Sequence, residues 1–391
     1  MSVETVDKSS SAEFFSALNR LFHSQRVTSL VDEADKTGIF PRPLIELLGA
    51  EGILNAIFEL NAYPDLNALI TLDKGLGRLG SAGVSAGISL HNSALAILRR
   101  FGRNQCLSEI TKSAISGKSI LCIGASETGG GSDLQSIRSS TVKEGDGYRL
   151  RGHKKFVSLS PRSDYVILAV RGADSKSADK HGNIALFAVP TSNLSIGTPY
   201  RKVGAHSLET APVTFDTWLP AEMMIARPGT GLAALSWGLT HERLSIAGQV
   251  AGACELALGV TVARMHVREQ FGKSLFEHQA LRQRIADLAS RVDILHLALT
   301  GIAAQGSPLN LRTAAGIKVT AARLGQEVIA ECMHIFGGAG YLSDETPLGR
   351  WWQDMKLARV GSGVDEVLWE LVAGSLIPDY DNYNRLVRET S

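Results

Sequence analysis

The segment SETGGGSD, residues 126–133, follows directly after the apolar run SILCIGA. Three consecutive glycines let the backbone approach a ligand closely, and the hydroxyl groups of Ser126 and Ser132 offer hydrogen bonds to polar or phosphate atoms of a cofactor. Glycine-rich loops also occur without any ligand. The segment therefore predicts a cofactor-binding loop only together with matching segments elsewhere in the chain.

Three other side chains have chemistry that a cofactor site uses. The planar guanidinium of Arg268 suits a pyrophosphate, because it donates two charge-assisted hydrogen bonds at once. Phe156, in the run KKFVSLS, offers a flat ring, and His334 both donates and accepts hydrogen bonds. Each also has an ordinary interpretation: a solvated helix arginine, a core aromatic residue and a structural histidine.

Three regions of the chain must bring these residues together. From Ser11 to about Gly117, apolar residues recur every three or four positions, which is typical of helices. Short runs rich in Val, Ile, Leu and Phe then predict strands up to about Ile225, and long helical patterns follow. The sequence thus predicts an α+β fold, with an N-terminal helical domain over residues 1–118, a central β domain over 119–226 and a C-terminal helical bundle over 227–391.

The composition argues against several classes of protein. The 391 residues are 44% hydrophobic and 20% charged, and a net charge of +1 gives no basic field for nucleic acid. The four cysteines, Cys106, Cys122, Cys254 and Cys332, are scattered singly, which predicts no metal site and no disulfide framework. No apolar run reaches the length needed to span a bilayer, and the polar start MSVETVDKSSSAEFF is unlike an export signal. We expect a cytoplasmic protein that binds neither nucleic acid nor membranes.

Four segments together resemble the acyl-CoA dehydrogenase family of flavoproteins. SETGGGSD is similar to the family's TEPxxGSD, with Ser126 in place of the threonine and Thr128 in place of the proline. KKFVSLS is similar to the strand that flanks the flavin, and the long run from HERLSIAG contains the RxxFG element at Arg268 and Phe271. MHIFGGAGY resembles QIxGGxGY, with His334 in place of the glutamine. The segments follow the family's order over most of the chain.

The resemblance implies an acyl-CoA dehydrogenase-like fold with a central β-barrel-like domain, a C-terminal four-helix bundle, and FAD held between the domains and across a subunit interface. The flavin would lie against five residues of the first two segments: Ile123, Ala125, Ser126, Phe156 and Ser158. Ser132 would contact the pyrophosphate and pantetheine region. Arg268 and Phe271 would support the FAD of a neighbouring subunit, and His334, Gly337 and Gly338 would pack against the adenosine half.

Removing a proton beside a thioester carbonyl needs a desolvated carboxylate, because burial raises its pKa toward the working pH. Most relatives place this glutamate in a YEGT sequence eight residues after an aspartate, but counting from Asp354 this chain has GSGV at 361–364. A branch that includes isovaleryl- and long-chain acyl-CoA dehydrogenases places it where Glu242 stands, before Arg243. We assign Glu242 as the base, with Glu366 as the fallback. Ser362 retains the backbone amide that polarises the thioester in the family.

The resemblance therefore implies FAD-dependent α,β-dehydrogenation of an acyl thioester, with proton abstraction by a glutamate and hydride transfer to the flavin. The implied partners are an acyl-CoA or acyl-carrier-protein substrate, an electron-accepting flavoprotein or similar acceptor, and further copies of the chain in a homodimer or homotetramer. The missing YEGT leaves two alternatives open: a flavin-dependent monooxygenase on the same fold, and a degenerate, non-catalytic flavoprotein.

Overall fold

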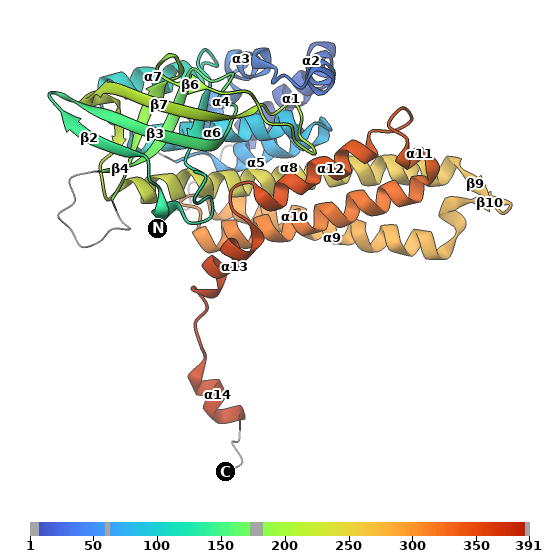
Figure 1. Ribbon diagram of the computed structural model, residues 1–391. Helices are drawn as coiled ribbons and strands as arrows, with labels where there is room; N and C mark the ends of the chain where they lie inside the picture. The colour runs from blue at the N-terminus through green and yellow to red at the C-terminus, as the bar shows by residue number, and fades with distance from the viewer. Residues whose placement is uncertain (1–7, 59–62, 173–182, 388–391) are drawn as a thin grey trace.

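The computed structural model describes residues 8–58, 63–172 and 183–387, which form three parts in the order α, β, α (Figure 1). The N-terminal helices and the sheet lie together, and long C-terminal helices extend away from them as a bundle. This arrangement confirms the predicted α+β class and the order of its parts. Residues 1–7, the beginning of the polar start used in the export argument, lie outside the described residues.

The N-terminal part is helical, as the spacing of its apolar residues predicts. Ser24, Asp65 and Asn104 each cap a helix by accepting a hydrogen bond from a backbone N–H of its first turn. Pro41 and Pro43 lie at the start of the third helix. The helices are α1 (Lys8–Phe22), α2 (Gln25–Thr37), α3 (Arg42–Ala50), α4 (Ile53–Phe58), α5 (Leu66–Arg78), α6 (Ala82–Phe101) and α7 (Gln105–Ile115).

The middle part is an eight-stranded mixed sheet with the order β6-β7-β3-β2-β4-β5-β8, in which β1 pairs with β4 off this path. β2 and β3 form a hairpin whose turn is the run EGDG, residues 144–147, and Gly145 in this turn has a positive φ of 64°. The strands are β1 (Leu121–Gly124), β2 (Ser140–Glu144), β3 (Gly147–Ser158), β4 (Tyr165–Gly172), β5 (Ile184–Pro190), β6 (Ser195–Ile196), β7 (Thr210–Pro220) and β8 (Met224–Ala226).

The C-terminal part consists mainly of long antiparallel helices (Figure 1). At the far end of the bundle, a small hairpin of two short strands lies between the first two of these helices. A last helix, α14, lies away from the rest of the chain in the same view. The elements are α8 (Gly231–Val267), β9 (Glu269–Gln270), β10 (Lys273–Ser274), α9 (Gln279–Gln305), α10 (Leu311–Phe336), α11 (Gly338–Tyr341), α12 (Leu348–Val360), α13 (Asp365–Ala373) and α14 (Tyr380–Leu386).

Helix α8 contradicts one expectation drawn from the sequence, that of the absence of a membrane-spanning length of apolar residues. Its 37 residues include an 18-residue window of mean hydropathy 1.5, so by length and composition it could cross a membrane, contrary to the expectation that no run is long enough. Half of that window is buried inside the protein. The helix is apolar on more than one face because it packs against α5, α6, α9 and α10. It is therefore the central helix that joins the two large hydrophobic cores.

Candidate active site

A cavity of about 800 Å³ lies where the N-terminal helices, the sheet and the bundle meet. Helix α6 lines one side, strands β1 and β3 with the glycine-rich loop line another, and α8, α12 and the turn at 361–364 line the rest. The structure brings nine of the predicted site residues into this lining. They are Ile123, Ala125, Ser126, Ser132, Phe156, Ser158, Glu242, Arg243 and Ser362.

The sheet side of the cavity presents an apolar surface with hydroxyl groups at its edge. Strand β1 pairs in parallel with β4 and delivers Ile123 to the cavity. An irregularity in the pairing of β3 falls at Phe156, whose ring is 55% exposed. Ser158 shares a hydrogen bond of 2.9 Å with Thr210, and both residues line the cavity. A flat ring with polar edges fits this wall, so these residues suit the flavin that the sequence implies.

A buried ion pair fixes the glycine-rich loop. Lys154 is fully buried, and its Nζ donates to Glu127 Oε1 at 2.7 Å and to the carbonyl of Ala125 at 3.2 Å. The Glu127 carboxylate in turn accepts hydrogen bonds from the backbone N–H groups of Arg138 and Ser139. The pair thus ties the start of the loop to the residues after its end. Between them the loop presents bare backbone, as at Gly129, where an added Cβ would meet nothing within 4 Å.

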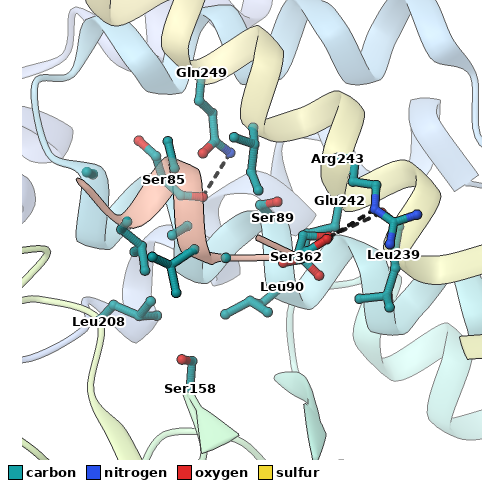
Figure 2. A pocket seen from close by; sticks show the side chains of 18 of the residues that line it. Ser85, Ser89, Leu90, Ser158, Leu208, Leu239, Glu242, Arg243, Gln249 and Ser362 are labelled. Atoms are coloured by element: carbon teal, nitrogen blue, oxygen red, sulfur yellow. Dashed lines mark hydrogen bonds between the residues drawn. The ribbon is translucent and has the colours of Figure 1, made fainter. Parts of the chain in front are cut away.

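Glu242 lies on α8 at the cavity wall and is 8% exposed. Burial raises its pKa to about 7, and the positive charges of Arg243 and Lys318 offset part of that rise. Figure 2 shows it beside Ser362, with Ser158 on the sheet side. A carboxylate with this pKa accepts a proton near neutral pH, as the assigned base must.

The turn at 361–364 meets α8 at the same point. Ser362 accepts a hydrogen bond of 3.1 Å from Arg243 Nε through its carbonyl, and its hydroxyl donates to the carbonyl of Leu239 at 3.3 Å. Its φ is 56°, a left-handed conformation that is uncommon outside glycine. Within the described part of the chain, the Ser362 amide N–H has no hydrogen-bond acceptor. It is therefore free to donate to a ligand in the cavity.

The cavity continues from Glu242 along one face of α8. Seven residues of this helix line it between Glu242 and Leu256, a stretch of about 21 Å at ~1.5 Å per residue. They are Glu242, Arg243, Ile246, Gln249, Val250, Ala253 and Leu256. Most of them are apolar, which suits a hydrocarbon chain.

One amide group interrupts this apolar face. Gln249 Nε2 donates to Asp73 Oδ1 at 2.9 Å and to the carbonyl of Ser85 at 3.0 Å, and thereby joins α8 to α5 and α6 (Figure 2). Asp73 is fully buried, and burial raises its pKa to about 7 against the hydrogen bonds of Ser245 and Gln249. The polar groups here fasten the helices that form the cavity wall.

Six predicted residues lie outside the cavity lining. The five at the far end of the bundle have exposed side chains or backbone: Arg268, Phe271, His334, Gly337 and Gly338. Phe271 is 96% exposed. Glu366, the fallback base, lies in the first turn of α13 and faces solvent. The structure therefore gathers the predicted base and flavin-ring residues, and places the predicted adenosine residues elsewhere.

Two residues of the site were not singled out from the sequence. Lys318 lies in the mostly apolar run AAGIKVTAA, and a charge within such an apolar helix pattern is a signal that could have marked it. Lys154 lies among the alternating residues of β3, where a lysine is usually on the solvent side, so no local signal marked it. Both are fully buried.

Comparison with known proteins agrees with this geometry. Residues 122–218 match the family model "Acyl-CoA dehydrogenase, middle domain", and residues 229–377 match "Acyl-CoA dehydrogenase, C-terminal domain". The chain is 58% identical over 370 residues, 95% of either chain, to the acyl-[acyl-carrier-protein] dehydrogenase MbtN of Mycobacterium sp. (strain MCS). It is 27% identical to the mitochondrial long-chain specific acyl-CoA dehydrogenase of Rattus norvegicus, over 95% of this chain and 87% of that one.

The fold is also that of solved members of the family. The butyryl-CoA dehydrogenase of Megasphaera elsdenii superposes with a TM-score of 0.87 and 25% identity, over 97% of this chain and all of that one. The sequence matches cover both the sheet and the bundle, and the structural match extends over nearly the whole chain. The chain therefore belongs to the acyl-CoA dehydrogenase family of FAD-dependent oxidoreductases.

Proposed function

We propose that this enzyme desaturates a long acyl group that is held as a thioester on an acyl carrier protein. As a member of its family it is an FAD-dependent dehydrogenase of acyl thioesters. The observation that carries the residue-level proposal is the position of Glu242, a buried carboxylate with a pKa near 7 at the wall of the large cavity.

Glu242 would take the proton from the carbon beside the thioester carbonyl. The electron pair of that C–H bond then forms the new double bond as a hydride leaves the next carbon. When bound, FAD supplies the acceptor for that hydride. Ser126, Phe156 and Ser158 would hold the flavin ring against the sheet, so that the acyl chain lies between it and α8.

The thioester oxygen would accept a hydrogen bond from the Ser362 amide. Ser362 lines the cavity as Glu242 does, and its amide N–H is unpaired within the described residues. A fixed donor at that point stabilises the negative charge that develops on the oxygen as the proton leaves. A serine side chain at 362 leaves the backbone donor in place, although the glutamate of most relatives is missing.

The acyl chain would extend along α8 toward Ala253 and Leu256. The cavity lining over this stretch is long and mostly apolar, which favours a long hydrocarbon chain over a short one. The carrier is proposed from the 58% identical relative that is named an acyl-carrier-protein dehydrogenase, whereas the relative named for acyl-CoA is only 27% identical.

We further propose a homodimer or homotetramer, an electron-transferring flavoprotein as the acceptor, and a cytoplasmic location. The exposed Phe271 and Arg268 support the first proposal, because a second chain would cover them. The free state of all four cysteines supports a reducing compartment. The monooxygenase and the non-catalytic flavoprotein have the missing YEGT in their favour, whereas the buried carboxylate of Glu242 at the cavity wall favours the dehydrogenase.

The test is anaerobic reduction of the purified enzyme by matched thioesters. Palmitoyl groups on acyl carrier protein, on coenzyme A and on pantetheine are compared at equal concentrations, with flavin bleaching and the enoyl product as readouts. Preference for the carrier protein is expected. Equal or better use of palmitoyl-CoA would contradict the proposed carrier, and bleaching by none of the thioesters would contradict the proposed substrate class.

A further inference from the structure

Two buried cations hold the turn at 361–364 from inside the bundle. Lys318 on α10 is 0% exposed, and its Nζ donates to the carbonyl oxygen of Gly363 at 2.7 Å. Arg243 on α8 is also buried, and its Nε donates to the carbonyl oxygen of Ser362 at 3.1 Å. Two successive peptide groups of the turn are therefore fixed by side chains from two different helices (Figure 2 shows the second contact).

The end of the turn is fastened by a third set of charges. Asp365, the residue directly after the turn, is buried and accepts hydrogen bonds from Arg359 on α12 and Arg323 on α10. The segment is thus held at Ser362, Gly363 and Asp365 from three helices.

The turn needs this support because of its backbone conformation. Ser362 has a φ of 56° and Gly363 a φ of 109°. A residue with a Cβ resists the left-handed region, so such a conformation persists only where the surroundings hold it. The dihedral angles at Ser362 determine where its amide N–H points, and this N–H has no acceptor within the described residues.

We infer that Lys318 is a positioning residue for the reaction: by holding the Gly363 carbonyl it keeps the Ser362 amide directed at the thioester oxygen beside Glu242. The inference rests on the proposed function. Lys318 does not line the cavity, so it touches neither substrate nor flavin and acts through the turn.

The positive charge of Lys318 also acts on Glu242, the proposed base. Among the described residues, the charged groups that act on Glu242 are Arg243 on α8 and Lys318 on α10, and the uncharged Ser89 of α6 lines the same cavity. Beyond Lys318 lie Asp365 and Arg359 at the ends of α13 and α12. Because the Lys318 cation lowers the pKa of Glu242, removing it should move the acidic limb of the pH–rate profile to higher pH.

The experiment compares Lys318→Met, Lys318→Gln and Lys318→Arg in the full-length, flavin-loaded enzyme. Val328→Ala is the matched control, because Val328 is equally buried on α10 but lies far from the turn. kcat, KM and the pH–rate profile are measured with palmitoyl-acyl carrier protein, and flavin content and the thermal midpoint are recorded for each protein.

We expect Lys318→Met to lower kcat by about tenfold or more, short of the ~100- to 1000-fold cost of losing an oxyanion donor itself. KM should change little, and the acidic limb of the pH–rate profile should move to higher pH. Lys318→Arg should retain most of the wild-type kcat, and the acidic limb of its pH–rate profile should lie at the wild-type pH. Lys318→Gln, which retains a donor without the charge, should shift the limb even if Lys318→Met does not fold. Val328→Ala should lower the thermal midpoint only.

Two results would overturn the inference. If Lys318→Met and Lys318→Gln lose thermal stability but keep the wild-type kcat and pH profile, Lys318 has a structural role only. If the wild-type enzyme oxidises no thioester, the proposed function fails and the inference fails with it, whereas an active wild type with unaffected Lys318 variants overturns the inference alone.

Discussion

The two ends of helix α8 differ in burial: one end lies inside the chain beside the cavity, and the other is exposed to solvent. Near its start, Glu242 and Arg243 are buried beside the cavity. At its end, 26 residues and about 39 Å further on, Arg268 and Phe271 face solvent. One bound FAD would not reach both of these points on the helix. In the proposed homo-oligomer, Arg268 and Phe271 would therefore support a cofactor only if they lie against the cavity of a second chain.

The largest expected effect is at the cavity end. Glu242→Gln keeps the shape of the side chain but removes the proton acceptor, so kcat should fall by about 100- to 10,000-fold with flavin content unchanged. Anaerobic bleaching by palmitoyl-acyl carrier protein measures it. Glu366→Gln is the control, because this exposed fallback base should be dispensable. The reverse result, an inactive Glu366→Gln and an active Glu242→Gln, would reassign the base.

The far end should show a different defect. Arg268→Ala should weaken FAD binding by roughly tenfold to a hundredfold, the usual cost of a hydrogen bond to a charged group. The flavin-to-protein ratio after purification and titration of the apoprotein with FAD measure it. Arg312→Ala, an exposed arginine at the start of α10, should bind FAD normally. Normal FAD binding by Arg268→Ala would contradict the shared site.

Co-expression of the two defective chains sharpens the comparison. In a mixed dimer, one site would combine an intact Glu242 from the Arg268→Ala chain with an intact Arg268 from the Glu242→Gln chain. Random pairing should therefore restore roughly a quarter of the wild-type activity. Different affinity tags would verify that mixed dimers form. Mixed dimers without recovered activity would show that each site is built from one chain.

A smaller effect should separate the deep part of the cavity from its catalytic part. Ala253→Phe fills the cavity about 16 Å along α8 from Glu242, at ~1.5 Å per residue. KM for the palmitoyl thioester should rise by about tenfold because the chain end is excluded, whereas butyryl turnover should not change. An equal change with both substrates would mean that the acyl chain takes another path.

The smallest effect is the pH dependence of stability. Asp73 has a pKa raised by burial from 3.8 to about 7, so the folded chain retains a proton that the unfolded chain has lost in this window. The contribution of Asp73 to stability should therefore be fully present below about pH 4 and be lost as the pH rises from about 4 to about 7, by about 4 kcal/mol at ~1.36 kcal/mol per pKa unit. Denaturant unfolding of Asp73→Asn should show a flatter dependence.

Glu277, at the far end of the bundle, serves as the control because its pKa is shifted in the opposite direction. Hydrogen bonds from Ser274 lower the pKa of Glu277, so its contribution is present at neutral pH and is lost only as the pH falls below its unfolded value. Glu277→Gln should leave the slope between about pH 5 and about pH 7.5 unchanged. A flatter slope in this variant, or an unchanged slope in Asp73→Asn, would contradict the assignment to burial.

Much of the fold followed from local patterns. The three- and four-residue spacing of apolar residues predicted the helices, and the short runs rich in Val, Ile, Leu and Phe predicted the strands. The expectation that no run is long and apolar enough to span a bilayer was wrong at α8, and the hydropathy of a run does not reveal whether protein or lipid surrounds it. Lys154 was missed because an alternating strand does not reveal which of its polar residues is buried with a partner.

The sequence by itself determined the family, the order of helical and strand segments, and the identity of the residue types at the site, because these depend on neighbouring positions and on recognisable motifs. Only the tertiary structure decided which residues meet. Arg243, Lys318 and the turn at 361–364 are far apart in the chain, and the hydrogen bonds of the two cations to Ser362 and Gly363 depend on how α8, α10 and the turn pack. The raised pKa of Glu242 was decided there too, because desolvation is a property of the packed interior and not of the residue.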